Sequence, residues 1–423
     1  MNFFFRFLLL ILFLILIYII YKSEIYWQGK NRSYYLIYYT GILLTTISVI
    51  IFNYLNIKIK KYIIIIFISF FFSFYLFEGI LVSYKIKKLN LHIESITKLY
   101  EDLKKVNSNI TFATFPNNFL QSNSENLFIL AGKSKIKTIF CSENGYYSIY
   151  DSDRYGFNNP DKEWDSKEIE YVLIGDSFTH GACVNRPNDI ASVLRLYSKK
   201  SVLNLGMGGN GPLIEYATLR EYLDSRAKNV LWLFYEGNDL SNLKGELKNN
   251  ILNKYLNNQT FKQNLKIKQT EIDHILTIYI EKEKKSVTEK KRQGVLIGEF
   301  IKLFNTRSLL FKEKFVSIPP ELKLILKLTK NLVKNHNGKL YFVYLPEFYR
   351  YKNPNFYEIN DLKNQIKKIV DDLGIEFIDI DEEVFKKEKN FLKLFPSNEG
   401  GHYNIEGYKK VAIKIYEKTK YNK

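Results

Sequence analysis

The chain has 423 residues, of which 46% are apolar and 25% charged, a balance that excludes both a disordered chain and a bundle buried wholly in a membrane. Its formal net charge is +18, but Lys and Arg are spread along the whole length, so the charge does not predict nucleic-acid binding. The two cysteines exclude a disulfide-scaffold protein and a Cys-rich zinc module, and they leave room for one disulfide.

Three long apolar runs occupy the first part of the chain, at residues 7–21, 34–52 and 63–82. Each is about long enough to cross ~30 Å of hydrocarbon at ~1.5 Å per helical residue. The first run has no small-residue cleavage site after it, which favours an uncleaved anchor over a signal peptide. Residues 1–88 are therefore predicted to be a membrane anchor of about three transmembrane helices.

The orientation of this multi-pass anchor depends on conflicting signals. The loop at 58–61 carries three lysines, which favours the cytoplasmic side and places the C-terminal part outside, whereas the lysines that flank the other helix ends favour the opposite. Cys141 and Cys183 could pair only in an oxidising compartment, or they could be two buried free thiols. On the possible disulfide we predict an extracytoplasmic C-terminal domain.

The rest of the chain divides into a linker and an α/β domain. Residues 89–165 are predicted to be a stalk and an irregular linker. From residue 166, short apolar runs at 170–174, 202–205, 230–235, 339–345 and 376–380 alternate with segments of helical spacing, which predicts a parallel sheet with helices on both faces. A Lys-rich helical insertion, expected to be solvated, interrupts this 166–423 domain at about 241–320.

Polar residues and glycines follow the predicted strands, where an open α/β sheet binds its ligands. Ser177 follows the first strand and would be a nucleophile, because the neutral imidazole of His402 could accept its proton. Glu399 could reach His402 across the Gly-Gly turn and hold its tautomer. The amides of Ser177 and Gly209 and the Asn238 side chain would bind the oxyanion.

The remaining residues and motifs predict supporting roles and neither a cofactor site nor a metal site. Asp176 and Asp239 are predicted to support the strand-end loops. The run at 206–211 matches G-x-G-x-x-G, but it follows the second strand and precedes Pro212, so no dinucleotide or other cofactor is predicted. The chain has no HxH, HExxH or CxxC spacing, and no metal site is predicted. His180 could line the pocket or face solvent.

Four blocks together resemble the GDSL or SGNH hydrolases. They are Gly175-Asp176-Ser177, the Gly209 region, Gly237-Asn238-Asp239 and Glu399-Gly400-Gly401-His402, in the family's order. The resemblance covers residues 168–423 apart from the insertion, and it implies a three-layer, flavodoxin-like parallel sheet. Two features depart from the family pattern: the third block is GND instead of GxND, and Glu399 stands where the family has Asp, so Asp379 or Asp381 could substitute.

The resemblance implies an enzyme that acts on acyl esters without a cofactor. The chain resembles the membrane-anchored members that add or remove acetyl groups on cell-surface polysaccharides, which implies a serine esterase (a carbohydrate esterase) or an O-acyltransferase. Its partners would be an acylated glycan or other ester and the membrane, with no nucleic acid. The alternative is a non-catalytic glycan-binding or scaffold protein that retains the fold.

Overall fold

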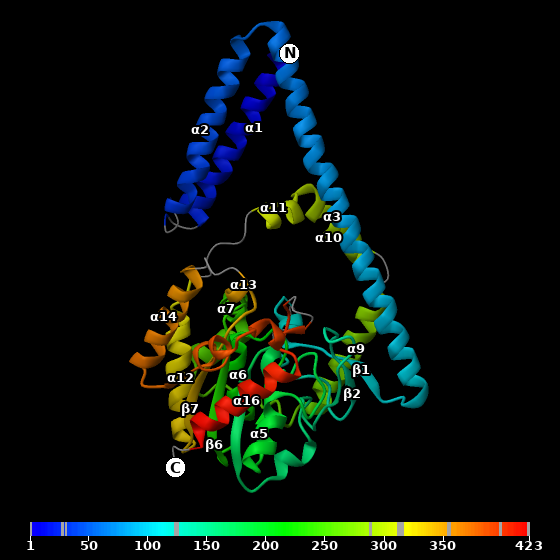
Figure 1. Cartoon of the computed structure of the whole chain (residues 1–423), viewed down its shortest axis with the longest axis vertical. Helices are drawn as coiled ribbons and strands as arrows, with labels where there is room; N and C mark the ends of the chain where they lie inside the picture. The colour runs from blue at the N-terminus through cyan, green and yellow to red at the C-terminus, as the bar shows by residue number, and fades with distance from the viewer. Residues whose placement is uncertain are drawn as a thin grey trace. The chain divides into compact units, whose positions relative to one another are not determined.

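The computed structural model describes residues 2–26, 29, 32–121, 127–286, 290–310, 317–352, 357–396 and 400–420 (Figure 1). The chain forms two compact units, which are described separately. The membrane unit comprises Met1–Asn90 and Arg292–Glu313, and the sheet unit comprises Leu91–Lys291 and Lys314–Lys423. The chain therefore passes between the two units three times.

Three apolar helices make up most of the membrane unit: α1 (Asn2–Ile20), which continues into a π-helical turn (Tyr21–Tyr26), α2 (Arg32–Tyr54) and α3 (Ile57–Val106). All three are long and apolar enough to cross a membrane. They coincide with the three apolar runs of the sequence. Two shorter helices, α10 (Lys290–Ile301) and α11 (Phe304–Leu310), belong mostly to the same unit.

A five-stranded parallel sheet forms the centre of the second unit. Its strands are β4 (Ile169–Gly175), β5 (Val202–Asn204), β6 (Ala227–Tyr235), β7 (Lys339–Leu345) and β8 (Glu376–Asp379). The order across the sheet is β5-β4-β6-β7-β8, the flavodoxin-like order, which confirms the predicted fold class. Each strand overlaps one of the five predicted apolar runs.

The two faces of the sheet pack into two separate hydrophobic cores. Val172 and Ile174 of β4 lie in one core, and Tyr171 and Leu173 lie in the other, as the two-residue period of a strand requires. The first core is covered by α6 (Pro212–Tyr222), α12 (Glu321–Asn335) and α14 (Tyr357–Asp372), and the second by α5 (Ile190–Ser198) and α16 (Ile405–Thr419). The domain therefore has three layers.

The segment before the large sheet, residues 110–165, is called here the leading segment. It contains a second sheet of three-residue strands, β1 (Ile110–Phe112), β2 (Lys137–Ile139) and β3 (Ile149–Asp151), in the order β1-β2-β3. Residues 127–131 of this segment are buried in the first core of the large sheet. The sequence predicted an irregular linker here, because strands of three residues are too short to show an alternating pattern.

The described residues of the insertion form helices, and the insertion is not solvated along its length. It includes α7 (Asp239–Glu246), α8 (Asn250–Asn257) and α9 (Gln269–Ser286), followed by α10 and α11. Leu252, Tyr255 and Leu276 of α8 and α9 are fully buried in the first core. The Lys-rich composition concealed these apolar positions because it dominates the average over the segment.

Candidate active site

Ser177 stands at the carboxyl end of β4 and is the first residue of the short helix α4 (Ser177–His180). The Asp176 carboxylate caps this helix, because it accepts a hydrogen bond of 2.9 Å from the amide of Phe178. β4 is flanked by β5 and β6, so the turns that carry Gly209 and Asn238 follow the two neighbouring strands. The edge predicted from the sequence thus brings the three turns together.

His402 connects Ser177 to a carboxylate. Its Nε2 lies 2.8 Å from the Ser177 Oγ, and its Nδ1 lies 3.0 Å from Oε1 of Glu143. The amide of His402 also donates to Oε2 of Glu143, over 2.7 Å. When Nδ1 donates to the carboxylate, Nε2 is left as the acceptor for the serine hydroxyl, so the three side chains form a serine-hydrolase arrangement.

Gly401 provides the space for this carboxylate. Its φ is +97°, and a Cβ at this position would lie 2.5 Å from Oε2 of Glu143. The Gly-Gly pair before His402 was predicted to be a tight turn through which Glu399 reaches the imidazole. In the structure, the absence of a side chain at Gly401 instead allows Glu143 to approach from the leading segment.

The alternative acids lie elsewhere or outside the described residues. Glu399 falls outside the residues that the structure describes. Asp381 accepts hydrogen bonds from the Tyr351 hydroxyl (2.6 Å) and the Lys363 ammonium (2.7 Å), and Asp379 pairs with the same lysine at 3.1 Å. Asp379 and Asp381 therefore bind Lys363 and Tyr351, whereas Nδ1 of His402 faces Glu143.

Sequence reasoning did not find Glu143. It lies before the first residue of the large sheet, in a segment without a recognisable motif. One signal was present: Glu143 comes two residues after Cys141, and Cys183 comes six residues after Ser177. A disulfide between Cys141 and Cys183 would bring Glu143 close to Ser177.

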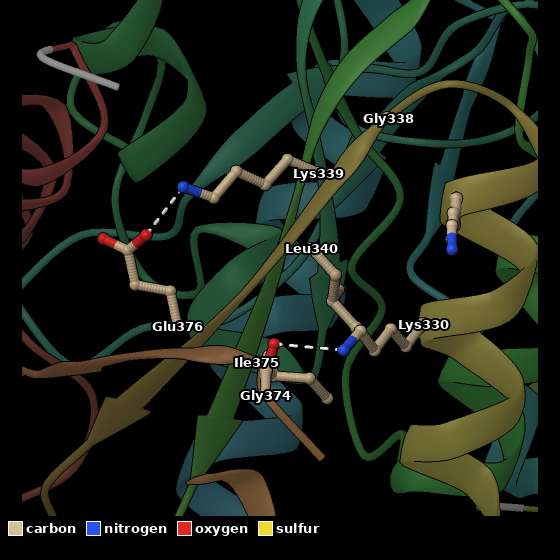
Figure 2. A pocket seen from close by; sticks show the side chains of 8 residues that line it. Lys330, Gly338, Lys339, Leu340, Gly374, Ile375 and Glu376 are labelled. Carbon is tan, nitrogen blue, oxygen red and sulfur yellow. Dashed lines mark hydrogen bonds and ion pairs between the residues drawn. The ribbon is translucent and has the colours of Figure 1, made fainter. Parts of the chain in front are cut away.

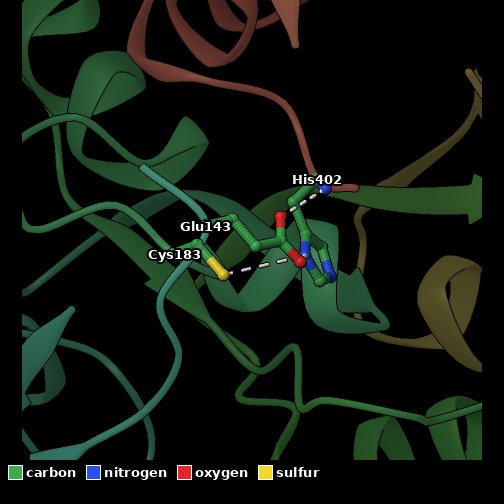
Figure 3. Close-up of side chains that lie close together, drawn as sticks. All are labelled: Glu143, Cys183 and His402. Atoms are coloured by element: carbon green, nitrogen blue, oxygen red, sulfur yellow. Dashed lines mark hydrogen bonds and ion pairs between the residues drawn. The ribbon is translucent and has the colours of Figure 1, made fainter. Parts of the chain in front are cut away.

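That disulfide is present in the structure, between Cys141 and Cys183. The Cys183 Sγ lies 3.9 Å from Nδ1 of His402, and Figure 3 shows Cys183 and Glu143 on the same side of the imidazole. Ligand atoms of Glu143, Cys183 and His402 all lie within 4.8 Å of one another, a spacing that could suit a metal ion. A disulfide sulfur is not a thiolate, however, so this trio lacks the sulfur ligand that such a site would use.

Two carboxyl groups of the site are shifted in opposite directions. Burial alone would raise the pKa of Glu143, but the hydrogen bond and charge of the His402 side chain and the hydrogen bond from its amide together lower it below the ordinary value. Burial raises the pKa of Asp176 to about 6, although the hydrogen bond from the Phe178 amide, the charge of His402 and a hydrogen bond from the Asn238 side chain oppose this. Glu143 is thus held as the anion beside the imidazole.

The turn that carries Gly209 is packed against Asn117 and hydrogen-bonded to Asn242. The φ of Gly209 is +72°, and a Cβ there would lie 2.2 Å from Nδ2 of Asn117 in the leading segment. On the other side, Nδ2 of Asn242 donates to the carbonyls of Gly209 (3.1 Å) and Asn210 (3.2 Å). Gly209 is therefore fixed in a conformation that an L side chain rarely adopts.

The two remaining residues predicted at this edge begin α7. Asn238 is the residue just before α7, and the Asp239 carboxylate accepts a hydrogen bond of 2.8 Å from the Tyr235 amide. Asp239 is fully buried, and burial raises its pKa well above the ordinary value. It therefore contacts the backbone of the strand end.

His180 joins the leading segment to α4. It is fully buried, with its ring 4.5 Å from Phe140 and 5.1 Å from Tyr150 between centroids, and neither lines a solvent-facing pocket nor faces solvent. Burial lowers its pKa to about 3, so the imidazole is neutral. The ring is part of the packing that holds the leading segment against α4, the helix that Ser177 begins.

A pocket of about 430 Å³ lies at the opposite edge of the sheet (Figure 2). It is lined by the beginnings of β7 and β8 and by α12, at the amino ends of the strands. Two of its three lysines have partners: Lys330 donates to the carbonyls of Leu373 and Gly374, and Lys339 pairs with Glu376 at 2.7 Å. This pocket is separate from the Ser177 edge.

The flavodoxin-like sheet, with Ser177, His402 and Glu143 in line at its carboxyl edge, has the architecture of an α/β protein with a serine-hydrolase arrangement. The chain belongs to the GDSL-like lipase/acylhydrolase family, whose model matches residues 171–415, more than half of the chain. Family membership supports an esterase or acylhydrolase activity. None of the curated proteins matches the chain significantly.

Solved structures of the same kind resemble part of the chain. A putative lipolytic protein of the G-D-S-L family from Desulfitobacterium hafniense is 16% identical, with a TM-score of 0.35, and the alignment covers 59% of this chain and 99% of that one. The acetyl xylan esterase AlAXEase is 13% identical, with a TM-score of 0.32, and the alignment covers 59% of this chain and 100% of that one.

Proposed function

We propose that this chain is a membrane-anchored serine esterase or acyl-transfer enzyme that uses Ser177, His402 and Glu143. The observation that carries the proposal is the unbroken hydrogen-bonded line from the Ser177 hydroxyl through both ring nitrogens of His402 to the Glu143 carboxylate. Family membership supplies the reaction class. Glu143 takes the role that was predicted for Glu399, because Glu143 is the carboxylate that faces Nδ1 of His402.

The chemistry follows from the proton positions. Oγ of Ser177 attacks the acyl carbonyl while Nε2 of His402 takes the hydroxyl proton, and Glu143 stabilises the imidazolium that forms. The carbonyl oxygen becomes an oxyanion, for which the amides of Ser177 and Gly209 and the Asn238 side chain would be the donors. The imidazolium then protonates the leaving alcohol, and an acyl-serine remains.

Water or a sugar hydroxyl would complete the cycle, as an esterase or a transferase respectively. His402 and Glu143 keep 22% and 31% of their side-chain surface exposed, which leaves the site open to a large acceptor. We propose acetyl esters of cell-surface glycans as the substrate class, on the resemblance to membrane-anchored family members. The Cys141–Cys183 disulfide supports an extracytoplasmic location for this domain, because such bonds persist in oxidising compartments.

The test is labelling of the full chain with a fluorophosphonate probe, which bonds covalently to activated serines. We expect wild-type labelling, and none in Ser177→Ala or His402→Ala. Ser198→Ala and the surface variant His274→Ala are the matched controls and should label normally. Absence of labelling in correctly folded wild type would contradict the proposal and favour the non-catalytic glycan-binding alternative.

A second measurement separates the two reactions. An aryl acetate is supplied with and without an acetyl-free oligosaccharide, and the acetyl group is followed. Release of acetate at the same rate in both conditions indicates an esterase. Appearance of acetyl groups on the sugar, with a faster release of the aryl alcohol, indicates a transferase.

A further inference from the structure

Two helices of the insertion pack against the part of α3 that is apolar enough to cross a membrane. The hydroxyl of Tyr75 donates to the carbonyl of Ile301 over 3.1 Å, and the Tyr75 and Phe300 rings lie 5.5 Å apart. Lys85 pairs with Glu299 at 2.7 Å, three residues beyond the end of the apolar run at 63–82. These contacts lie within the membrane unit and join segments more than 200 residues apart in the chain.

Glu78 is the centre of this contact. It is fully buried, although it lies inside the apolar run of α3. Its carboxylate accepts hydrogen bonds from the amide and side chain of Asn305 (3.0 and 2.7 Å) and from the amide and hydroxyl of Thr306 (both 2.7 Å). A carboxylate within a membrane span costs several kcal/mol unless it is paired or hydrogen-bonded. The hydrogen-bond donors of α11 therefore reduce the cost of Glu78 in α3.

The depth of the contact follows from helix geometry. Tyr75 precedes the end of the apolar run, Val82, by seven residues, which is ~10 Å along a helix. Helices that lie in a membrane interface bury their apolar face by about 5–10 Å. The contact therefore lies at the depth of an interfacial helix, and Lys85 and Glu299 mark the polar boundary.

Among the described residues, α10 and α11 expose both large apolar and polar side chains. The exposed large apolar side chains are Ile297 (58%), Ile301 (62%), Phe304 (49%) and Leu309 (61%), and the polar side chains of Lys302, Arg307 and Ser308 are exposed beside them, as on a helix that lies in a membrane interface. At the depth set by Tyr75 and Glu78, the material that surrounds α3 in a bilayer is acyl chain and headgroup. The apolar surface of α10 and α11 is thus continuous with the lipid-facing surface of the span.

We propose that α10 and α11 are embedded in the membrane interface, held to α3 by Glu78, with Ile297, Ile301, Phe304 and Leu309 in contact with lipid acyl chains. The occupant of this apolar face is the bilayer. The insertion then attaches the sheet unit to the membrane a second time, independently of the chain that follows α3.

The test uses nitroxide labels on the full chain in liposomes of phosphatidylethanolamine and phosphatidylglycerol. Cysteines replace Ile301 and Leu309, with Ile278 on α9 as the matched control, because it is a similarly exposed (57%) isoleucine of the sheet unit. The native cysteines are paired, and unsubstituted protein serves as the blank. Collision with oxygen, which concentrates in lipid, is compared with collision with a water-soluble nickel chelate.

We expect oxygen collisions to dominate at 301 and 309, and nickel collisions at 278, so that the oxygen-to-nickel ratio differs several-fold. Nickel access at 301 and 309 equal to that at 278 would overturn the proposal. Low access to both reagents would also overturn it, because a protein partner would then cover this face.

The role of Glu78 has its own test. Glu78→Ala removes the acceptor of all four hydrogen bonds, and we expect nickel access at 301 to rise toward that of the control. An unchanged ratio would overturn the assignment of Glu78 as the link. Activity of Ser177 on a soluble ester is measured in parallel, and it should not change, so that this proposal and the proposed function fail separately.

Discussion

The site joins two regions that the sequence describes very differently. The α/β domain provides Ser177 at the end of β4 and His402 just before α16, where short motifs mark them. The leading segment provides Glu143 from a loop without a motif, and residues 171–415 of the family match do not include it. Ser177 is placed by the end of β4 and His402 by the start of α16. A carboxylate that pairs with His402 needs only to reach one ring nitrogen, so it can come from any segment that packs nearby.

The two regions are nevertheless one packed body. Phe157 and Trp164 of the leading segment lie in the same core as the large sheet, and the neutral His180 lies against Phe140. The disulfide adds a covalent link beside the imidazole. The carboxylate is therefore as well positioned as the residues with motifs, although its sequence surroundings give no sign of this.

The largest effect is expected when the carboxylate of Glu143 is replaced by an amide. Glu143→Gln keeps the shape of the side chain but removes the charge that stabilises the imidazolium and selects its tautomer, and we expect kcat to fall by about 10³–10⁴-fold. Glu399→Gln is the matched control and should change kcat little. The reverse outcome would return the role to Glu399 and make the leading segment purely structural.

The next largest effect belongs to the sheet edge. Asn238→Ala removes a proposed oxyanion donor, and a loss of about 10²–10³-fold in kcat is expected, with KM nearly unchanged. Asn253→Ala on α8, whose amide bonds only to a nearby carbonyl, is the control. A change in KM without a change in kcat would show that Asn238 binds the ground state instead.

The disulfide should matter less than the acid that it positions. Cys141→Ser combined with Cys183→Ser is expected to lower the free energy of unfolding by about 2–4 kcal/mol, since the bridge closes a 42-residue separation. kcat should fall, but by less than in Glu143→Gln. In the triple variant the two losses in kcat should not add, because both act through Glu143; additive losses would show that the bridge acts elsewhere.

The smallest effects are in the pH dependence of stability, and they have opposite signs in the two regions. The lowered pKa of Glu143 gives stability that is present above about pH 4.5 and is lost as the pH falls below it. The raised pKa of Asp176 gives stability that is present below about pH 3.8 and is lost as the pH rises through about 6. The free energy of unfolding of Glu143→Gln and Asp176→Asn is measured in urea from pH 3 to pH 7. Each variant should lack the pH-dependent contribution of the carboxyl group that it has lost. The same pH dependence in both variants would contradict these shifts.

Most of the fold could be predicted from the sequence, because five buried strands and three apolar helices leave long runs of the expected period. The strands of the leading segment could not, because they are three residues long and mix polar and apolar residues, whereas the equally short β5 lies in the apolar run at 202–205. In the site, the sequence predicted that Ser177 and His402 lie at the same edge of the sheet, because both come after predicted strands. Glu143 did not, because its contact with His402 spans 259 residues and depends on the room left by Gly401.

The long separations in the site also set an order in time. Cys183 precedes His402 by 219 residues, which ribosomes take on the order of 10–40 s to add. The segments that carry Ser177 and Glu143 can be linked through the disulfide during this interval, while the imidazole of His402 does not yet exist. If Ser177 acts as proposed, a growing chain carries it without its base until His402 and α16 (Ile405–Thr419) are made and α16 packs on α5.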